Sequence, residues 1–514
     1  MNTTNDTLQL MAAAQKQPLA DDVARAFTQP GSATTGLIAY DLEIPSKKLY
    51  PLLTPLRNRI PRRTGGYSIQ SNWRAVTGIN TGNQFPGVSE GQRGGIITQS
   101  TADYYAKFVG LGLENSVTFE ADYASQNFED VKALAAIQLL QSLMIQEEFC
   151  DLGGNGTTAI TTAAPAAATT ADVTTGGSLP RSTTYYIGYV PLTLQGYQQL
   201  AGHNNGSVGF AADLTVGLVQ SVVRTNTDGT TDTINGGTGR PATITTQATS
   251  GAGSDVHSIT ATCPAVAGAV GYAWYLGITG ASTCYLHSVT TINSQLFTDT
   301  ASAANQAYSA LTDADKSANA LIYDGMIPQI VKSGSGAYVR TLATGTAGTG
   351  TKLTTDGAGG IAELNTAFAS FWDNYRLSPD EMYVGSQVLI DMNALIIKNG
   401  GAPLIRYNMD SSGGSLDAGV VVATVLNKIT NTRVKVLIHP NMPPGMLMFW
   451  SNSVPYPLND VGSIVLKHLR RDYYQIEWPL RSRKYEYGVY MDGVLKNYFP
   501  PAFGVIKNIG AGYA

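Results

Sequence analysis

An abrupt change in charge content constrains how this chain can fold more than any other feature of its sequence. Between residues 153 and 312 only nine residues carry a charge, and none of them is Lys or Glu: Asp172, Arg181, Asp213, Arg224, Asp228, Asp232, Arg240, Asp255 and Asp299. The flanking segments are charged at about one residue in six. A composition step of this kind at both ends predicts a domain inserted into an outer one.

The low-charge segment has the pattern of an all-β domain. Runs rich in Thr, Val and Tyr recur at 183–194, 216–225, 257–263, 271–278 and 285–292, with turn clusters such as 226–229 between them. This spacing predicts a β-sandwich. Residues 265–275 resemble the strand pair of fibronectin-type and immunoglobulin-like modules, in which a Trp or Tyr packs between the sheets. Residues 153–180, nearly all Thr, Ala, Gly and Pro, are interpreted as a linker into it.

The segment before the insert combines extended and helical parts. Its prolines exclude a continuous helix over 44–61, and the glycines among β-type residues in 62–101 predict a long twisted hairpin or loop. Residues 119–150 have helical apolar spacing, so we predict one unbroken helix. Asn115, Ser116 or Thr118 can cap its start, and Gly153-Gly154 can end it. Three acids, Glu147, Glu148 and Asp151, lie at the end that the helix dipole disfavours, which predicts cationic partners elsewhere.

The segment after the insert alternates helices and strands. Amphipathic spacing predicts helices over 361–375 and 386–397. Strands are expected at 433–438, 445–450, 473–478 and 485–490. The outer part is therefore predicted to be α+β.

Composition excludes several classes of protein. A net charge of −4 argues against a chain whose main task is to hold nucleic acid through phosphate contacts. Three cysteines are too few for a disulfide scaffold, and a reducing compartment fits them. The N-terminus has neither the basic nor the apolar part of a signal peptide, and no run of about 18 apolar residues could span a membrane.

Candidate catalytic and ligand-binding motifs do not survive a check of their context. Ser89 lies in a Gly-x-Ser-x-Gly pattern, but no apolar strand precedes it and glycines follow, so a loop is favoured. In the Gly-rich run 345–352 the Lys falls one position late and Leu353 replaces the hydroxyl residue of a phosphate-binding loop. Cys284 and His287 have ligand-like spacing, but a zinc site needs about four converging ligands. No catalytic, cofactor or metal site is predicted.

A basic cluster near the C-terminus has two interpretations. Its members are Lys467, His468, Arg470, Arg471, Arg481, Arg483 and Lys484. They could contact phosphate, but acids and alternating aromatic residues lie among them. Salt bridges between strands or subunits are the favoured interpretation, and the same weighing applies to Arg57, Arg59, Arg62 and Arg63.

The order of these parts resembles the major capsid proteins of tailed bacteriophages, with the fold named after phage Hong Kong 97. In that family the parts are the N-arm, E-loop, spine helix, P-domain and A-domain, and the Gly-Asn-Gly turn at 154–156 is similar to the family's Gly-Asp-Gly turn after the spine helix. The resemblance implies an α+β capsid fold with an inserted immunoglobulin-like sandwich. Some members cross-link subunits through an E-loop Lys, but residues 62–103 contain none, so no such cross-link is expected.

The resemblance implies a division of the chain into seven parts. These are an N-terminal segment and N-arm at 1–61, an E-loop at 62–103, the first part of the P-domain with the spine helix at 104–153, the insert with its linker at 154–312, a P-domain continuation at 313–360, an A-domain at 361–442, and closing strands of both domains at 443–514.

The resemblance also implies a function and partners. The chain would self-assemble as hexamers and pentamers into the icosahedral head shell around double-stranded DNA, held without sequence-specific binding. Expected partners are a separate scaffolding protein, a portal protein and a decoration or cement protein, with no membrane contact. The location would be the virion, after assembly in the host cytoplasm. The alternatives are a cell-surface or adhesin-like protein and a cellular nanocompartment shell.

Six residues are the candidates for subunit contact, and they define a hypothesis about assembly. They are Arg57, Arg59, Arg62, Arg63, Glu147 and Glu148. A shell subunit works by burying surface against its neighbours. We therefore expect the two acids to bind Arg side chains from a neighbouring arm.

Overall fold

The structure is a computed structural model of the 514-residue chain. It describes residues 47–79, 87–126, 128–200, 214, 217–226, 228–400, 405–410, 413–418 and 422–512. Helices and strands are mixed in the outer part, which confirms the α+β class. Among the described residues, no helix is long and apolar enough to cross a bilayer.

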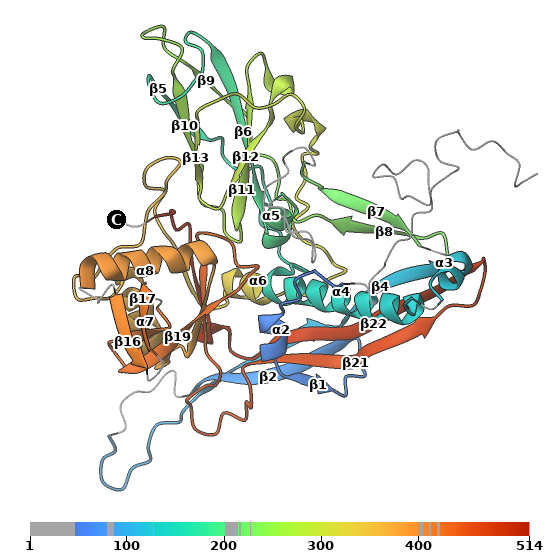
Figure 1. Ribbon diagram of the computed structural model, residues 1–514. Helices are drawn as coiled ribbons and strands as arrows, with labels where there is room; N and C mark the ends of the chain where they lie inside the picture. The colour runs from blue at the N-terminus through green and yellow to red at the C-terminus, as the bar shows by residue number, and fades with distance from the viewer. Residues whose placement is uncertain are drawn as a thin grey trace, which may run out of the picture.

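A long helix on a four-stranded sheet forms the elongated middle of the molecule (Figure 1). The helix is α4 (Val131–Gly153), and it packs on β4 (Val109–Thr118) and β22 (Lys484–Asn497). The sheet continues through β21 (Val465–Glu477) to β1 (Arg62–Thr64), which pairs in parallel with β21. Apolar residues of α4, β4 and β22, among them Leu143, Val117 and Val489, are buried between helix and sheet.

The prediction of one helix over 119–150 is wrong in one respect, because the helix is interrupted. A short α3 (Phe119–Ala124) precedes α4. Thr118 caps α3 by accepting a hydrogen bond from the Ala121 amide, and Asp130 caps α4 by accepting one from the Ala133 amide. Ser125 donates its hydroxyl hydrogen to the Asp122 carbonyl. Small polar side chains therefore satisfy the backbone where the chain turns, and they compete with helix continuation. The predicted stop at Gly154 is confirmed.

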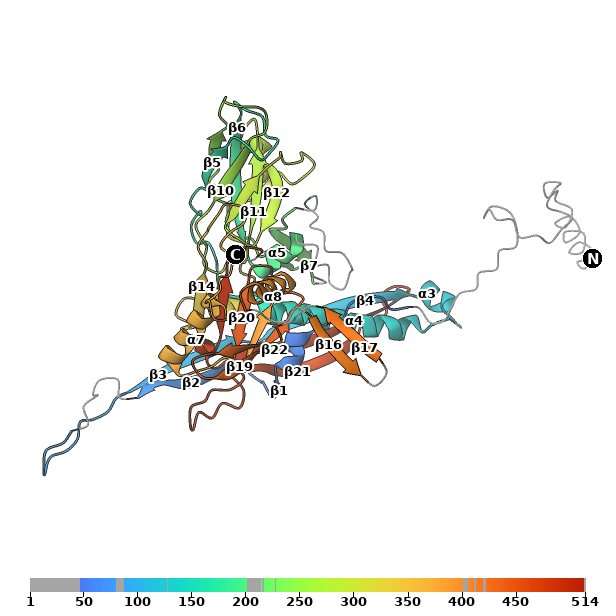
Figure 2. The ribbon, with the colours of Figure 1, turned by 60° about the vertical axis from the view of Figure 1, so that its left-hand side comes forward.

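The predicted hairpin is present and projects from the body (Figure 2). It consists of β2 (Gln70–Ile79) and β3 (Gln99–Lys107), paired antiparallel with Trp73 opposite Tyr104. Before it, residues 47–54 have no regular structure, and a single helical turn, α2 (Pro55–Arg59), starts on a proline. Proline suits this position because its missing N–H would be unpaired there in any case.

A second sheet of six strands lies beside the helix α4 layer. Its order is β14 (Tyr338–Thr341), β23 (Gly504–Lys507), β20 (Leu447–Trp450), β15 (Glu381–Val384), β19 (Thr432–Ile438) and β18 (Thr424–Asn427). The helices α7 (Ala362–Tyr375) and α8 (Ser386–Gly400) pack on it through one buried cluster that includes Phe368, Phe449 and Met392. These two helices were predicted, and the strands at 473–478 and 485–490 prove to be the ends of the longer β21 and β22.

The remaining elements of this region are short. They are α6 (Met326–Val331), the 3₁₀ turn η3 (Pro500–Ala502), and a two-stranded hairpin of β16 (Ile405–Asp410) and β17 (Gly413–Ala418).

The low-charge segment forms two facing sheets that stand above α4 (Figure 2). One sheet has the order β13 (Ser294–Phe297), β10 (Ser258–Thr262), β5 (Thr169–Val173), and the other β12 (Tyr285–Thr290), β11 (Gly271–Gly277), β6 (Thr184–Leu192), β9 (Thr245–Ala248). Trp274 is fully buried with Ile259 and Phe297 of the opposite sheet, as the inner-strand Trp predicts. A two-sheet all-β unit is therefore present, and its immunoglobulin-like character stays a prediction.

Parts of the low-charge segment differ from the prediction. The supposed linker at 153–180 contains β5, which pairs with β10. Its Thr and Ala side chains carry little apolar signal, because an edge strand with one solvated face needs few large residues. The segment is also not purely β, since it holds α5 (Leu194–Leu200), a separate hairpin of β7 (Ser221–Thr225) and β8 (Thr231–Asn235), and the 3₁₀ turns η1 (Ala281–Thr283) and η2 (Tyr308–Ala310).

We predict that Trp274→Ala destabilises the two-sheet unit by about 3–5 kcal/mol, because the loss of a fully buried indole leaves a cavity. The indole also donates a 2.8 Å hydrogen bond to the Thr290 hydroxyl. Urea unfolding together with limited proteolysis measures the effect, and cleavage should increase within 169–297. The matched control is Trp478→Ala, which removes a Trp that is 39% exposed. Equal destabilisation by both variants would contradict the assignment of Trp274 to the core.

Candidate functional site

Three carboxylates are buried at the C-terminal end of α4. Glu147, Glu148 and Asp151 are each at most 1% exposed. Their position next to the negative end of the helix dipole is unfavourable, and burial of a charge costs several kcal/mol unless it is paired. The structure supplies the cationic partners that the sequence predicts. We call these three acids and their partners the junction, because they join five parts of the chain.

Glu147 is the centre of the junction. Its carboxylate lies 2.6 Å from the Arg62 guanidinium, 3.2 Å from that of Arg57 and 3.3 Å from the Lys467 ammonium, and it accepts a hydrogen bond from the Tyr473 hydroxyl. Burial by itself raises the pKa of this carboxyl, but Lys467 and Arg62 outweigh it and lower the pKa to about 2. Glu147 is therefore ionised and joins β1 and β21 to α4.

Glu148 holds the arm helix. It accepts hydrogen bonds from the backbone N–H groups of Leu56 (3.0 Å) and Arg57 (2.7 Å), in the first turn of α2. A carboxylate at this place satisfies amides that have no partner within the helix. The other contact of Glu148 is with the ring of His439, at 2.6 Å, directly after β19. This one side chain therefore connects the arm and the six-stranded sheet to α4.

Asp151 completes the junction one helical turn further on. It lies 2.5 Å from the Lys467 ammonium and accepts a 2.7 Å hydrogen bond from the Tyr323 hydroxyl. Burial raises the pKa of Asp151 to about 6, with a further contribution from the nearby Glu147 charge, although Lys467 opposes the shift. Lys467 is 1% exposed and thus shared between two acids.

The four candidate arginines occupy different environments. Arg57 and Arg62 lie inside the junction, and Arg62 also pairs with Asp472 at 2.6 Å. Arg59 reaches Glu381 on β15 at 3.0 Å. Arg63 is exposed and is paired only in its backbone, opposite His468. In this chain the arginines of its own arm therefore bind Glu147, and its own arm helix binds Glu148, where the hypothesis expected a neighbour's. Contact of these residues with other subunits stays a prediction.

Sequence reasoning missed the roles of Lys467, Tyr473, Tyr323 and His439. Lys467 carried a signal, since it lies between Val465 and Leu469 on the inward-facing positions of a strand. A Lys at such a position is buried and therefore needs an acid. The other three lie 116 to 326 residues away from the acids in sequence, and no local pattern points to them.

The basic cluster agrees with the salt-bridge interpretation. Besides Lys467, Arg470 lies 3.7 Å from Asp492 on the paired strand, and Arg483 lies 2.9 Å from Glu120 of α3. Arg471 stacks its guanidinium 4.0 Å above the Tyr474 ring.

The motifs set aside in the sequence have structures that fit the favoured interpretation. Ser89 lies in an exposed loop next to a turn, and residues 346–350 form a tight turn. Cys284 is buried, and His287 pairs with Asp299 at 3.0 Å. Among the described residues no group of three or more His, Cys, Asp or Glu side chains could hold a metal ion.

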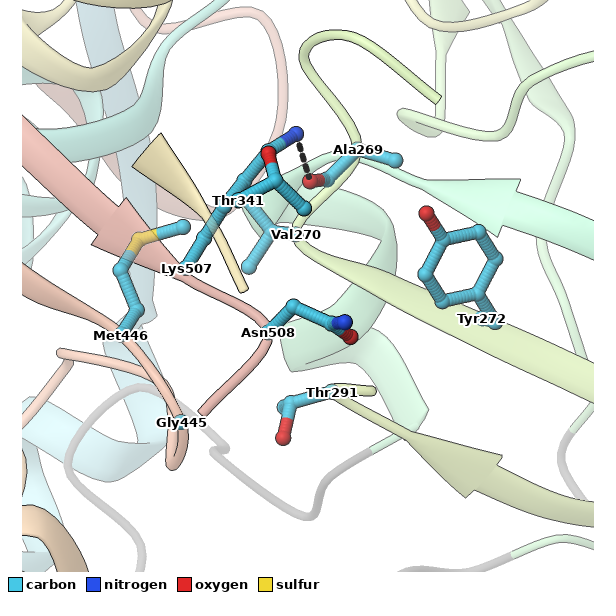
Figure 3. A pocket seen from close by; sticks show the side chains of 9 residues that line it. All are labelled: Ala269, Val270, Tyr272, Thr291, Thr341, Gly445, Met446, Lys507 and Asn508. Carbon is cyan, nitrogen blue, oxygen red and sulfur yellow. Dashed lines mark hydrogen bonds between the residues drawn. The ribbon is translucent and has the colours of Figure 1, made fainter. Parts of the chain in front are cut away.

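The two-sheet unit is attached to the body through a buried lysine (Figure 3). Lys507, which ends β23, is 6% exposed and donates hydrogen bonds to the carbonyls of Val266 (3.0 Å) and Ala269 (3.3 Å). The neighbouring Asn508 donates to and accepts from Asn293. Burial lowers the pKa of Lys507 to about 8. The attachment therefore uses carbonyl and amide groups in place of ion pairs.

The extended parts expose large apolar side chains. Leu49 in the arm is 85% exposed, Tyr67 at the base of the hairpin 96%, and Ile96 91%. Ile69 and Tyr105 are also mostly exposed. Apolar surface gathered on projecting segments marks a protein contact.

Comparisons with known proteins give a consistent set of similar structures. No family model matches the chain, and no curated protein matches it in sequence. The structure is similar to the capsid of Myoviridae phage XM1, with 10% identity, a TM-score of 0.40, and 93% of this chain and 100% of that chain covered. It is also similar to Gordonia phage Cozz, with 7% identity, a TM-score of 0.39, and coverage of 95% and 98%.

A weaker similarity is to an encapsulin of Synechococcus elongatus, with 11% identity, a TM-score of 0.22, and coverage of 36% of this chain and 57% of that chain. TM-scores this low do not by themselves assign a function, so the functional proposal depends on the chain's own architecture.

We predict that Glu147→Gln destabilises the chain by about 3–5 kcal/mol, because it leaves Lys467 and Arg62 buried without their shared charge. The folded pKa of about 2 lies below the ordinary 4.5, so Glu147 stabilises the fold fully above pH 4.5. That stabilisation is lost as the pH falls from 4.5 toward 2, and the variant should lack this loss. Urea unfolding of the unassembled subunit across this pH range measures both effects. The exposed Glu477→Gln is the matched control, and equal behaviour of the two variants would refute the role of Glu147.

We predict that Lys507→Met removes an alkaline rise in stability. Between about pH 8 and 10.5 the unfolded chain holds a proton that folded Lys507 has released, so raising the pH stabilises the fold. Unfolding curves from pH 7 to 10.5 should show this rise in the parent chain and in the exposed control Lys48→Met, but not in Lys507→Met. A rise of the same size in Lys507→Met would show that another group causes it.

Proposed function

We propose that this chain is the major capsid protein of a tailed phage, which self-assembles as hexamers and pentamers into an icosahedral head shell around double-stranded DNA. One observation carries the proposal: an arm and a long hairpin expose apolar side chains, while a buried charge network fixes their bases to a compact body. A monomeric protein has no use for such an arrangement, because exposed apolar segments promote association.

The geometry supports assembly through many shared contacts. The hairpin has two strands only, and a two-stranded hairpin is marginal by itself. Its apolar side chains would be buried on a neighbouring copy, so that each subunit both extends over another and is covered in turn. Repetition of modest contacts around a closed shell adds their free energies.

Among the candidate contact residues, Arg63 fits a subunit contact best, because it is exposed. Arg59 is 42% exposed and could extend its pairing to a neighbour. We assign Arg57, Arg62, Glu147 and Glu148 to positioning the arm within its own subunit, from which contacts to other subunits would start.

The proposed domain division follows the same scheme. The arm ends at 61, the E-loop covers 62–103, the P-domain comprises 104–153 and 313–360, the insert 154–312, the A-domain 361–442, and 443–514 supplies strands to both sheets. We propose an outward-facing insert of immunoglobulin-like type, a separate scaffolding protein, a portal protein and a decoration or cement protein. The location would be the virion after assembly in the host cytoplasm, with no membrane contact and no enzymatic activity.

Purified protein should form closed icosahedral particles, which size-exclusion chromatography and electron microscopy would detect. Co-expression with a scaffolding protein covers the case in which assembly needs one. A monomer that binds cells would favour the adhesin-like alternative, and particles that enclose protein cargo in place of DNA would favour a nanocompartment shell.

We predict that Ile69→Asp abolishes particle formation while leaving the subunit folded, because it places a charge on an apolar hairpin side chain that would be buried on a neighbour. Ile69 is 78% exposed, so the isolated subunit should unfold at the same urea concentration as the parent. Particle yield by sedimentation is the readout. Val256→Asp, at a half-exposed apolar position on the two-sheet unit, is the control and should assemble normally. Normal assembly of Ile69→Asp would remove the hairpin from the contact.

A further inference from the structure

A cleft of about 560 Å³ separates the middle of the molecule from the low-charge segment. Its floor is formed by β4 and α4, and its other walls by α5 and the β7–β8 hairpin. Three consecutive residues of β4, Leu111, Gly112 and Leu113, line it directly. The cleft lies on a different face of α4 from the junction that holds the arm.

The strand that lines the cleft has a free edge. β4 is the last strand of its sheet and pairs with β22 over residues 109–118. In the part of the chain that the structure describes, no strand pairs with its other side. An edge of this length presents a row of unpaired backbone groups, which is the usual site for an added strand.

The walls have two kinds of surface and one charge. Leu143 and Phe149 make one side apolar, whereas Gln195, Gln199 and Asn319 supply amide groups on the other. Arg224 is the charged residue of the lining; one of its nitrogens lies 3.0 Å from Asp232, and a guanidinium has further donors. Such a site fits an extended peptide that alternates apolar and polar side chains and carries an acid.

We propose that residues 6–11 of the same chain add as a strand to the free edge of β4 and fill this cleft. Their sequence is Asp-Thr-Leu-Gln-Leu-Met, in which Leu8 and Leu10 alternate with Thr7 and Gln9, and Asp6 supplies the acid for Arg224. No other charge lies within this stretch. The added strand also covers the inner face of the β7–β8 hairpin, which as an isolated pair of strands is marginal.

The position of the arm makes this connection possible. The description of the chain starts at Lys47, and the Tyr50 hydroxyl bonds to Gln141 on α4, the helix that forms part of the cleft floor. The intervening segment 12–46 has 35 residues, each spanning at most about 3.3 Å when extended. It therefore needs only a fraction of its length to pass around a helix about 10–12 Å in diameter.

Hydrogen exchange of the unassembled subunit, followed by mass spectrometry, tests this proposal. Deletion of residues 1–20 should speed the exchange of β4 amides about tenfold or more, because their added partner is lost. Leu8→Asp/Leu10→Asp should have the same effect, whereas Gln15→Asp/Gln17→Asp, the matched control outside the proposed strand, should not. Unchanged β4 exchange after the deletion would overturn the proposal. Protection that rises with protein concentration would overturn it too, because the occupant would then belong to a second copy.

Charge supplies an independent arm of the same test. Asp6→Arg should speed β4 exchange by placing a cation beside Arg224, whereas Asp22→Arg makes the same change in net charge outside the strand and should have no effect. Equal exchange in these two variants would remove Arg224 from the contact. Because every sample is the unassembled subunit, the result does not depend on whether particles form.

Discussion

The buried charge of Glu147 is the interaction on which the rest of the structure depends. A carboxylate without exposure is stable only when cations surround it, and here these cations come from the arm, from β1 and from β21. The same helical turn presents Glu148 to α2 and Asp151 to Tyr323. One turn of α4 thereby sets the direction in which the arm and the hairpin leave the body. Extended segments can make defined contacts only when their bases are held in this way.

The low-charge segment is attached by a different physical means. Its contact with the body depends on Lys507 and on paired asparagines, which donate to carbonyl and amide oxygens. Hydrogen bonds of this type have a net stabilisation of about 1 kcal/mol each, so several are needed. The division in charge content along the sequence is thus also a division in how surfaces are joined: ion pairs within the body, and neutral hydrogen bonds with one buried lysine between the body and the inserted unit.

Much of the fold could be predicted from periodicity and punctuation. The helices at 361–375 and 386–397 have apolar stripes, and the hairpin has glycines between β-type residues, so both were found. The interruption before α4 was missed because Thr118 and Asp130 both cap helices, and spacing alone does not show that two caps serve two helices. β5 was missed because its partner β10 lies about 90 residues away, and a Thr-rich edge strand has the composition of a linker.

By itself, the sequence determined that α4 ends in acids that need cations, that a low-charge unit interrupts an α+β body, and that no constellation of catalytic or metal-binding residues is apparent. These conclusions follow from local chemistry, because a charge, a helix end or a composition step is visible without its partner. Only the tertiary structure decided that Arg57, Arg62 and Lys467 are the partners and that one edge of β4 faces a cleft. The junction joins residues separated by 85 to 326 positions. Any of the chain's 33 Lys and Arg side chains could satisfy a carboxylate by charge, and only the path of the backbone brings three of them within reach of Glu147.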